Sequence, residues 1–219
     1  MGRRVLLVML LAAAAGCMPY HRARPGAETW RQGVKTVGVL PAIRILEISP
    51  GNVEEEHEEW TEQGKRNVVA ALSDGLRARG LHPKVMTWKT DDELDDVRLL
   101  YAEVAEAIWL YAYPPYTFPH KVERFEYGVG PIGKILDRAG ADVLLVAAGQ
   151  DRVGSDGRKL GMLAGMRAMA LLTLGLVDRA GNVVWFDVWG GAGIDLRQDA
   201  DVRESVEKLL SELPGTAAP

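Results

Sequence analysis

The stretch LLTLGLVDRAGNVVWFDVW, residues 171–189, decides the fold class of this sequence. Residues 171–177 are almost all apolar, which is typical of a strand that is buried on both faces. A turn-forming run follows, in which Gly181 and Asn182 accept positive φ angles without strain. β-Branched and aromatic residues then resume, with Asp187 as the one charge among them. The stretch therefore predicts two antiparallel strands joined by a tight turn.

The rest of the chain alternates between strand and helix patterns. Prolines mark the boundaries of several elements. Pro41 stops the first strand, Pro83 confines the second to an edge or a strand start, and Pro131 opens the third helix. Asn52, with Glu55 three residues later, forms a capping box that starts the first helix. Strands are predicted at residues 34–40, 82–88 and 141–148, and helices at residues 52–79, 91–113, 131–139 and 199–213.

This order predicts an α/β fold: a single domain whose mixed sheet is flanked by helices. The early strands, 34–40 and 141–148, are expected to be parallel through right-handed crossovers, and the C-terminal hairpin antiparallel. The second helix should turn one apolar side to the core, with members at helical spacing: Leu94, Val97, Leu100, Tyr101, Val104, Ile108 and Tyr111. The domain is assigned to residues 34–213, and the tail 214–219 is expected to be disordered.

The N-terminus has the pattern of a secretory leader. Arg3 and Arg4 precede an apolar run that is too short to span a bilayer, and the run ends at Cys17. Residues 14–17, AAGC, resemble the lipobox of bacterial lipoproteins, in which the cysteine is acylated; the alternative is an ordinary secretory signal with a chance cysteine. Cys17 is the only cysteine. We therefore expect a signal peptide at residues 1–16 and a lipidated N-terminus with a polar linker at 17–33. Met18 after the cysteine favours the outer membrane.

Several segments resemble a broad group of envelope lipoproteins: VKTVGVLP at 34–41, the helix ending in LRARG at 76–80, AGADVLLVA at 139–147 and LVDRAGNVVWF at 176–186. The group includes the N-terminal domain of TolB, the curli-secretion lipoprotein and activator lipoproteins of peptidoglycan synthases. The resemblance implies an α/β fold and partner binding in the periplasm without catalysis.

Catalytic and cofactor motifs are missing or incomplete. His57-Glu58-Glu59-Trp60 lacks the second histidine of a zinc protease, and no cysteine pair exists for zinc. Residues 128–133 match G-x-G-x-x-G, but Pro131 removes a backbone donor for phosphate, so a glycine turn before a helix is favoured. Asp151 and Asp156 lack the spacing of a calcium loop. After removal of the leader the net charge is about −6, which argues against nucleic acid. We expect no enzyme activity, cofactor or metal.

Two segments of the sequence each allow two interpretations. Residues 160–177 are long and apolar enough to suggest a membrane span, but Arg167 lies near the middle, which favours a Met-rich surface piece followed by a buried strand. The loop YPPYTFPH at 113–120 combines proline with aromatic residues that are typical of contact hot spots. Its candidate partner-binding residues are Tyr113, Tyr116, Phe118 and His120; alternatively, these rings cover the edge of the core beside Trp109.

The sequence therefore predicts a periplasmic lipoprotein that is anchored to the outer membrane through lipid on Cys17. Its expected role is non-enzymatic, either binding an envelope protein or assisting envelope assembly. The alternative is a module that binds a small ligand at the carboxyl ends of the parallel strands, near Pro41 and Gly149.

Overall fold

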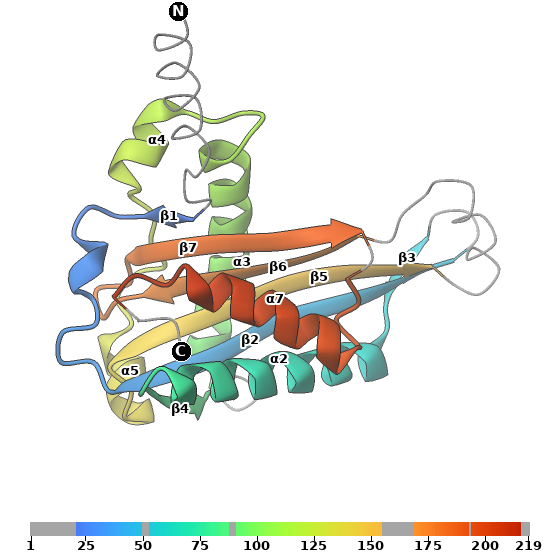
Figure 1. Ribbon diagram of the computed structural model, residues 1–219, viewed down its shortest axis with the longest axis horizontal. Helices are drawn as coiled ribbons and strands as arrows, with labels where there is room; N and C mark the ends of the chain where they lie inside the picture. The colour runs from blue at the N-terminus through green and yellow to red at the C-terminus, as the bar shows by residue number, and fades with distance from the viewer. Residues whose placement is uncertain (1–20, 50–52, 88–90, 155–168, 193, 216–219) are drawn as a thin grey trace, which may run out of the picture.

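A computed structural model of the chain describes residues 21–49, 53–87, 91–154, 169–192 and 194–215. One seven-stranded mixed sheet forms the centre of the molecule, with strand order β1-β7-β6-β5-β2-β3 and β4 paired to β2 (Figure 1). The strands are β1 (Arg22–Ala23), β2 (Thr36–Ile48), β3 (Glu54–Glu56), β4 (His82–Val85), β5 (Val143–Gly154), β6 (Met169–Val177) and β7 (Val183–Ala192). β2 is parallel to β4 and β5, whereas β6 is antiparallel to both of its neighbours. The α/β class, the parallel early strands and the antiparallel hairpin are all confirmed.

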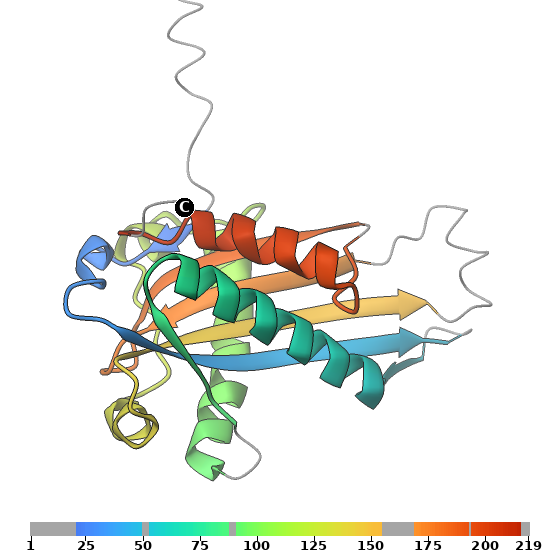
Figure 2. The ribbon, with the colours of Figure 1, turned by 60° about the horizontal axis from the view of Figure 1, so that its bottom comes forward.

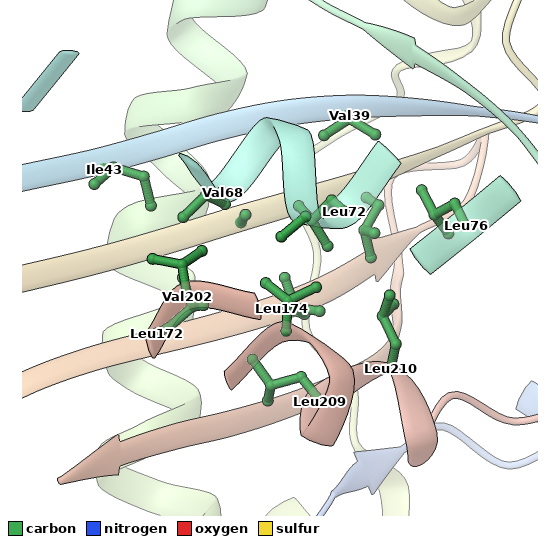
Figure 3. Packing of buried hydrophobic residues seen from close by; sticks show 14 of the residues in the cluster. Val39, Ile43, Val68, Leu72, Leu76, Leu172, Leu174, Val202, Leu209 and Leu210 are labelled. Atoms are coloured by element: carbon green, nitrogen blue, oxygen red, sulfur yellow. The ribbon is translucent and has the colours of Figure 1, made fainter. Parts of the chain in front are cut away.

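Helices cover both faces of the sheet. α2 (Glu58–Ala78) and α7 (Asp199–Ser211) lie side by side on one face, and α3 (Asp92–Ala112) crosses the other (Figures 1 and 2). Figure 3 shows leucine and valine side chains of α2 and α7 directed at the sheet. Two shorter helices lie on the same side of the sheet as α3. They are α4 (Pro119–Arg124), which follows α3 in the chain, and α5 (Gly133–Ala139). The two apolar cores meet only through the sheet between them.

β2 and β5 run well beyond the predicted strand ends. Pro41 does not stop β2, which pairs with β5 without interruption as far as Ile48 and Gly154. β4 pairs only with the first part of β2, to Val39, and β3 only with its end, from Leu46. Between those two points β2 has an open side, where a strand can accommodate proline because no neighbour needs its N–H group.

The start of α2 is also later than predicted. Glu54–Glu56 form strand β3 against β2, and α2 begins at Glu58 with His57 as its N-cap. The Nδ1 atom of His57 accepts a hydrogen bond from the Trp60 N–H at 3.4 Å, and the two rings stack at 3.9 Å. The capping box of Asn52 and Glu55 is therefore wrong. Similarly, α5 begins at Gly133, two residues after Pro131.

Residues 21–33, which the sequence predicts as linker, pack against the domain. β1 pairs with β7, with Arg22 opposite Phe186, and a single 3₁₀ turn, η1 (Ala27–Thr29), follows. The indole Nε1 of Trp30 donates to the carbonyl oxygen of Pro214 at 2.6 Å, which fixes the two ends of the domain together. The segment is therefore a structural strap across one edge of the sheet.

Candidate binding surface

The outward side of α3 carries exposed apolar side chains over three helical turns. We call Leu99, Leu100, Leu110 and Tyr111 the α3 face; Leu99 is 51% exposed and the other three are 39–46% exposed. The inward side of the same helix is buried against the sheet, with Leu94, Val97, Tyr101, Ala105 and Ile108. Helical spacing predicts Leu100 and Tyr111 in the core, but both are exposed to solvent, so this part of the prediction is wrong. Exposed apolar side chains grouped on one element are typical of contact surfaces.

Acidic residues alternate with the apolar residues of this surface. α3 contains six acidic side chains and a single basic one, Arg98, which pairs with Asp95 at 2.7 Å. Asp96, Glu103 and Glu106 are exposed among the leucines of the α3 face. A complementary partner would present apolar groups together with lysine or arginine, because charge complementarity selects partners and orients their approach.

The predicted aromatic loop is divided by the structure. Tyr113 is fully buried: its hydroxyl donates to the Phe186 carbonyl at 3.4 Å, and its ring lies 5.3 Å from that of Trp109. It is a core residue, so the prediction that it contacts a partner is wrong. Tyr116 and Phe118 are 65% and 45% exposed, and His120 is exposed as well. We call Tyr116, Phe118 and His120 the aromatic tip.

Arg22 joins the start of the described chain to the end of α3. Its Nε donates to the carbonyl oxygen of Ala112 at 2.8 Å, the last residue of that helix, and its guanidinium lies 4.6 Å from the centre of the Tyr113 ring. This contact satisfies a carbonyl at the C-terminus of α3, where a positive charge is also favoured by the helix dipole. The N-terminal strap and the aromatic tip therefore emerge from the same corner of the molecule. Sequence patterns contain no signal for this contact, because the two segments are 90 residues apart.

The predicted ligand position near Pro41 and Gly149 does not lie at strand ends. Pro41 pairs with Ala147, and Gly149 pairs with Ile43 in mid-strand. A Cβ atom at Gly149 would meet side-chain carbons of Ile43 and Leu172 at 3.0 and 3.1 Å, so core atoms already fill this space. A cavity of about 290 Å³ lies instead at the amino end of β5, between the strap and the hairpin turn. Its lining includes Arg24, Trp30, Asp178 and Asn182.

The glycine motif at 128–133 is part of the packing around the hairpin. The Val129 N–H donates to the Gly181 carbonyl at 2.8 Å, and Gly128 forms an isolated bridge to Asn182. Gly181, at φ 84°, lies so close to the Gly130 carbonyl that a Cβ atom would overlap it. No strand precedes the motif, so a turn that supports the hairpin is the interpretation that fits the structure.

Two buried carboxyl groups lie on the side of the sheet that faces α2 and α7. Asp151 pairs with Ala170 and Asp187 with Leu174, four positions apart along β6, which is about 13 Å of strand. Burial raises the pKa of Asp151, and the Leu196 N–H donates to its Oδ2 at 3.0 Å. At this separation the two groups do not form a paired acid and base. Within the described ranges, no group of three or more potential metal ligands converges.

Asp187 makes folding stability depend on pH. Burial raises the pKa of Asp187 to about 7, and the negative charge of Glu212 also raises it. The Val188 N–H, which donates to Oδ1 at 2.8 Å, and the positive charge of Arg22 lower the pKa and offset part of this rise. The unfolded value is about 4, so the folded state holds the proton more tightly, and stability is lost as pH rises from about 4 to about 7. We expect Asp187→Asn, which keeps the acceptor, to stabilise the domain at pH 8 by on the order of 2–4 kcal/mol.

Urea unfolding of the chain from residue 18 onward, at pH 4, 6 and 8, measures this effect. The Asp187→Asn protein should match the wild type at pH 4 and exceed it progressively as pH rises. Asp96→Asn, on the exposed side of α3, is the matched control and should leave the pH profile of unfolding unchanged. An equal stability difference at all three pH values would contradict the assignment of the titration to Asp187.

The Met-rich piece at residues 160–168 lies outside the described residues, whereas the strand predicted after it is β6. None of the helices in the described part of the chain is long and apolar enough to span a bilayer. In the described part of the chain, the aromatic tip and the α3 face are exposed and apolar and lie beside one another, with the rings of Phe118 and Tyr111 5.6 Å apart.

No protein-family model and no curated protein sequence matches this chain. Among solved structures, a PelC dodecamer from Paraburkholderia phytofirmans is similar at 14% identity, with 85% of this chain and 91% of that chain covered and a TM-score of 0.41. A competence or damage-inducible protein from Enterobacter asburiae matches at 15% identity, 86% and 93% coverage and TM-score 0.32. A DUF330 protein from Xanthomonas campestris matches at 12% identity, 83% and 80% coverage and TM-score 0.28. At these values the similarity assigns neither a family nor a function to this chain.

Proposed function

We propose that this protein is a lipid-anchored component of the bacterial envelope, held on the periplasmic face of the outer membrane, and that it binds a protein partner without catalysing a reaction. The arrangement of Arg3, Arg4, the apolar run and Cys17 supports the anchor. Each buried methylene contributes about 0.8 kcal/mol to membrane binding. One acyl chain therefore gives only reversible binding, whereas several chains on Cys17 would hold the protein stably at the membrane.

The α3 face is the observation that carries the partner-binding role. Its leucines lie on a helix whose other side already completes the core, so burying them adds nothing to the fold of the monomer. Burial against a partner would instead remove apolar surface from water, at about 25 cal/mol per Å². Asp96, Glu103 and Glu106 are exposed among these apolar side chains, so they favour a partner that combines apolar groups with lysine or arginine.

Photocrosslinking in living cells tests the proposal. We expect a benzophenone amino acid at Leu99 or Leu110 to capture one and the same envelope protein, because both positions lie on the α3 face. Glu204, exposed on α7 across the sheet, is the matched control and should capture none of it. The Glu103→Lys/Glu106→Lys variant, with both changes at exposed positions, should fold normally and lose most of the crosslinked product. Capture of unrelated proteins from the two α3 positions would contradict the proposal.

The anchor is tested in the same cells. The wild type should incorporate labelled palmitate and fractionate with membranes, whereas Cys17→Ser should take up no label and be released from them. A wild type without label, or a Cys17→Ser protein that remains equally membrane-bound, would overturn the lipid anchor.

A further inference from the structure

The aromatic tip lies at the corner from which the described chain begins. Figure 1 shows α4, which starts at Pro119 directly after Phe118, beyond the end of α3 and on the same side as β1, the edge strand of the sheet. Arg22 of β1 contacts Ala112 at the last turn of α3, and Tyr113 follows in the core. The chain therefore leaves the core at Tyr113, exposes Tyr116 and Phe118, and enters α4 within six residues.

The tip is held in a fixed position. The Phe118 N–H donates to the Tyr111 carbonyl at 2.9 Å, which closes the loop back onto α3. The Phe118 ring lies 5.6 Å from the ring of Tyr111 and 6.2 Å from that of His120. Because Tyr113 is anchored in the core beside Phe186, the exposed rings are presented on a rigid support and bind with little loss of conformational entropy.

The length of chain before β1 limits where a lipid on Cys17 can be. Five residues lead from Cys17 to Arg22, so the two Cα atoms are separated by at most about 18 Å even in a fully extended chain. Arg22 is itself fixed to the end of α3. An acylated Cys17 therefore brings the bilayer surface to this corner of the molecule, and the aromatic tip, with Tyr111 beside it, is exposed and apolar there.

We propose that the aromatic tip enters the lipid headgroup region beside the anchor and sets the orientation of the domain on the membrane. This inference rests on the lipid anchor of the proposed function. Tyrosine suits this depth because its ring is apolar and its hydroxyl remains hydrated. Around the tip, Lys121 and Arg124 are balanced by Glu123 and Glu126, so the contact depends on the aromatic rings rather than on anionic lipid. With the tip in the membrane, Leu99 and Leu100, at the part of the α3 face farther from the tip, remain available to a protein partner.

Free-thiol labelling of the lipidated full-length protein tests this orientation. Lipidation blocks Cys17, which is the only cysteine, so Tyr116→Cys, Phe118→Cys and the control Glu204→Cys each add one reactive thiol. Each variant receives an environment-sensitive fluorophore and is reconstituted into vesicles of phosphatidylethanolamine and phosphatidylglycerol with brominated acyl chains. We expect a blue shift and several-fold stronger quenching at positions 116 and 118 than at 204, unchanged in high salt or when phosphatidylglycerol is omitted.

Each outcome gives a distinct answer. Equal quenching at all three positions, in protein that stays with the vesicles, would overturn the inference and leave the anchor intact. A thiol that reacts at Cys17, with protein that does not associate with vesicles, would overturn the proposed function instead. Quenching at the tip that disappears in high salt or without phosphatidylglycerol would contradict the aromatic contact. A benzophenone at Tyr116 that captures protein rather than lipid in cells would assign the tip to a protein partner and overturn the membrane contact.

Discussion

Gly175→Val is expected to cost the domain on the order of 3 kcal/mol of folding free energy, a large part of what a domain of this size possesses. Gly175 lies in β6 under α3, where the fully buried Tyr101 rests on the sheet. A Cβ atom at Gly175 would overlap the hydroxyl and ring carbons of Tyr101. The ring has no space to move within the core, so the variant must displace α3 or lose the burial of Tyr101.

A double-mutant cycle in urea isolates this contact. In a Tyr101→Ala background the added valine has room, so Gly175→Val should cost far less there than in the wild type, with a coupling of roughly 2–3 kcal/mol. Gly191→Val is the matched control: it lies on the adjacent strand β7, where a Cβ atom makes an ordinary contact with Ile194 at 3.8 Å. Additive costs for Tyr101→Ala and Gly175→Val would show that the two residues do not interact.

The hairpin could be predicted because its signals are local. The apolar run of β6, the turn and the β-branched run of β7 are contiguous, and the turn closes as expected: Asp178 accepts from the Asn182 N–H at 2.9 Å and Gly181 has a positive φ. Each feature stabilises the same structure as its neighbours, which is the condition under which a sequence pattern is reliable. The helices α3 and α7 were predictable for the same reason.

The strands β2 and β3 could not be delimited in this way, because their extent depends on distant partners. Pro41 is tolerated only because β4 and β3 leave part of β2 open on one side. Glu54–Glu56 have the composition of a helix start, but they pair with the end of β2 and form a strand. Histidine is not among the preferred N-cap residues, so the true start of α2 at His57 has no strong signal in the sequence.

The location of the aromatic tip was predictable, but not which of its tyrosines is exposed, and the α3 face was not predicted. The proline and aromatic pattern identifies the loop at 113–120, yet it cannot separate Tyr113 from Tyr116. On α3, Leu100 and Tyr111 lie next to the core stripe at helical spacing, and only the packing of the helix on the sheet shows that they face solvent. Apolar periodicity identifies a helix more reliably than it identifies the helix's inner side when both sides are apolar.

Tyr113→Ala is expected to destabilise the domain by about 3–5 kcal/mol, whereas Tyr116→Ala should change its stability by no more than about 0.5 kcal/mol. Tyr113 fills the space between Trp109 and Phe186, and its loss also removes the support for Arg22 at the start of the chain. Tyr116 is 65% exposed and leaves no cavity when truncated.

Urea unfolding of the two variants, in the chain from residue 18 onward, measures the difference. Tyr116→Ala also separates folding from function, because it should retain the wild-type unfolding midpoint and still lose the contact made by the aromatic tip. Tyr113→Phe, in contrast, should retain most of the stability and all of the tip. Equal destabilisation by Tyr113→Ala and Tyr116→Ala would mean that both tyrosines belong to the core. The exposed tip would then be reduced to Phe118 and His120, too small a surface to orient the domain by itself.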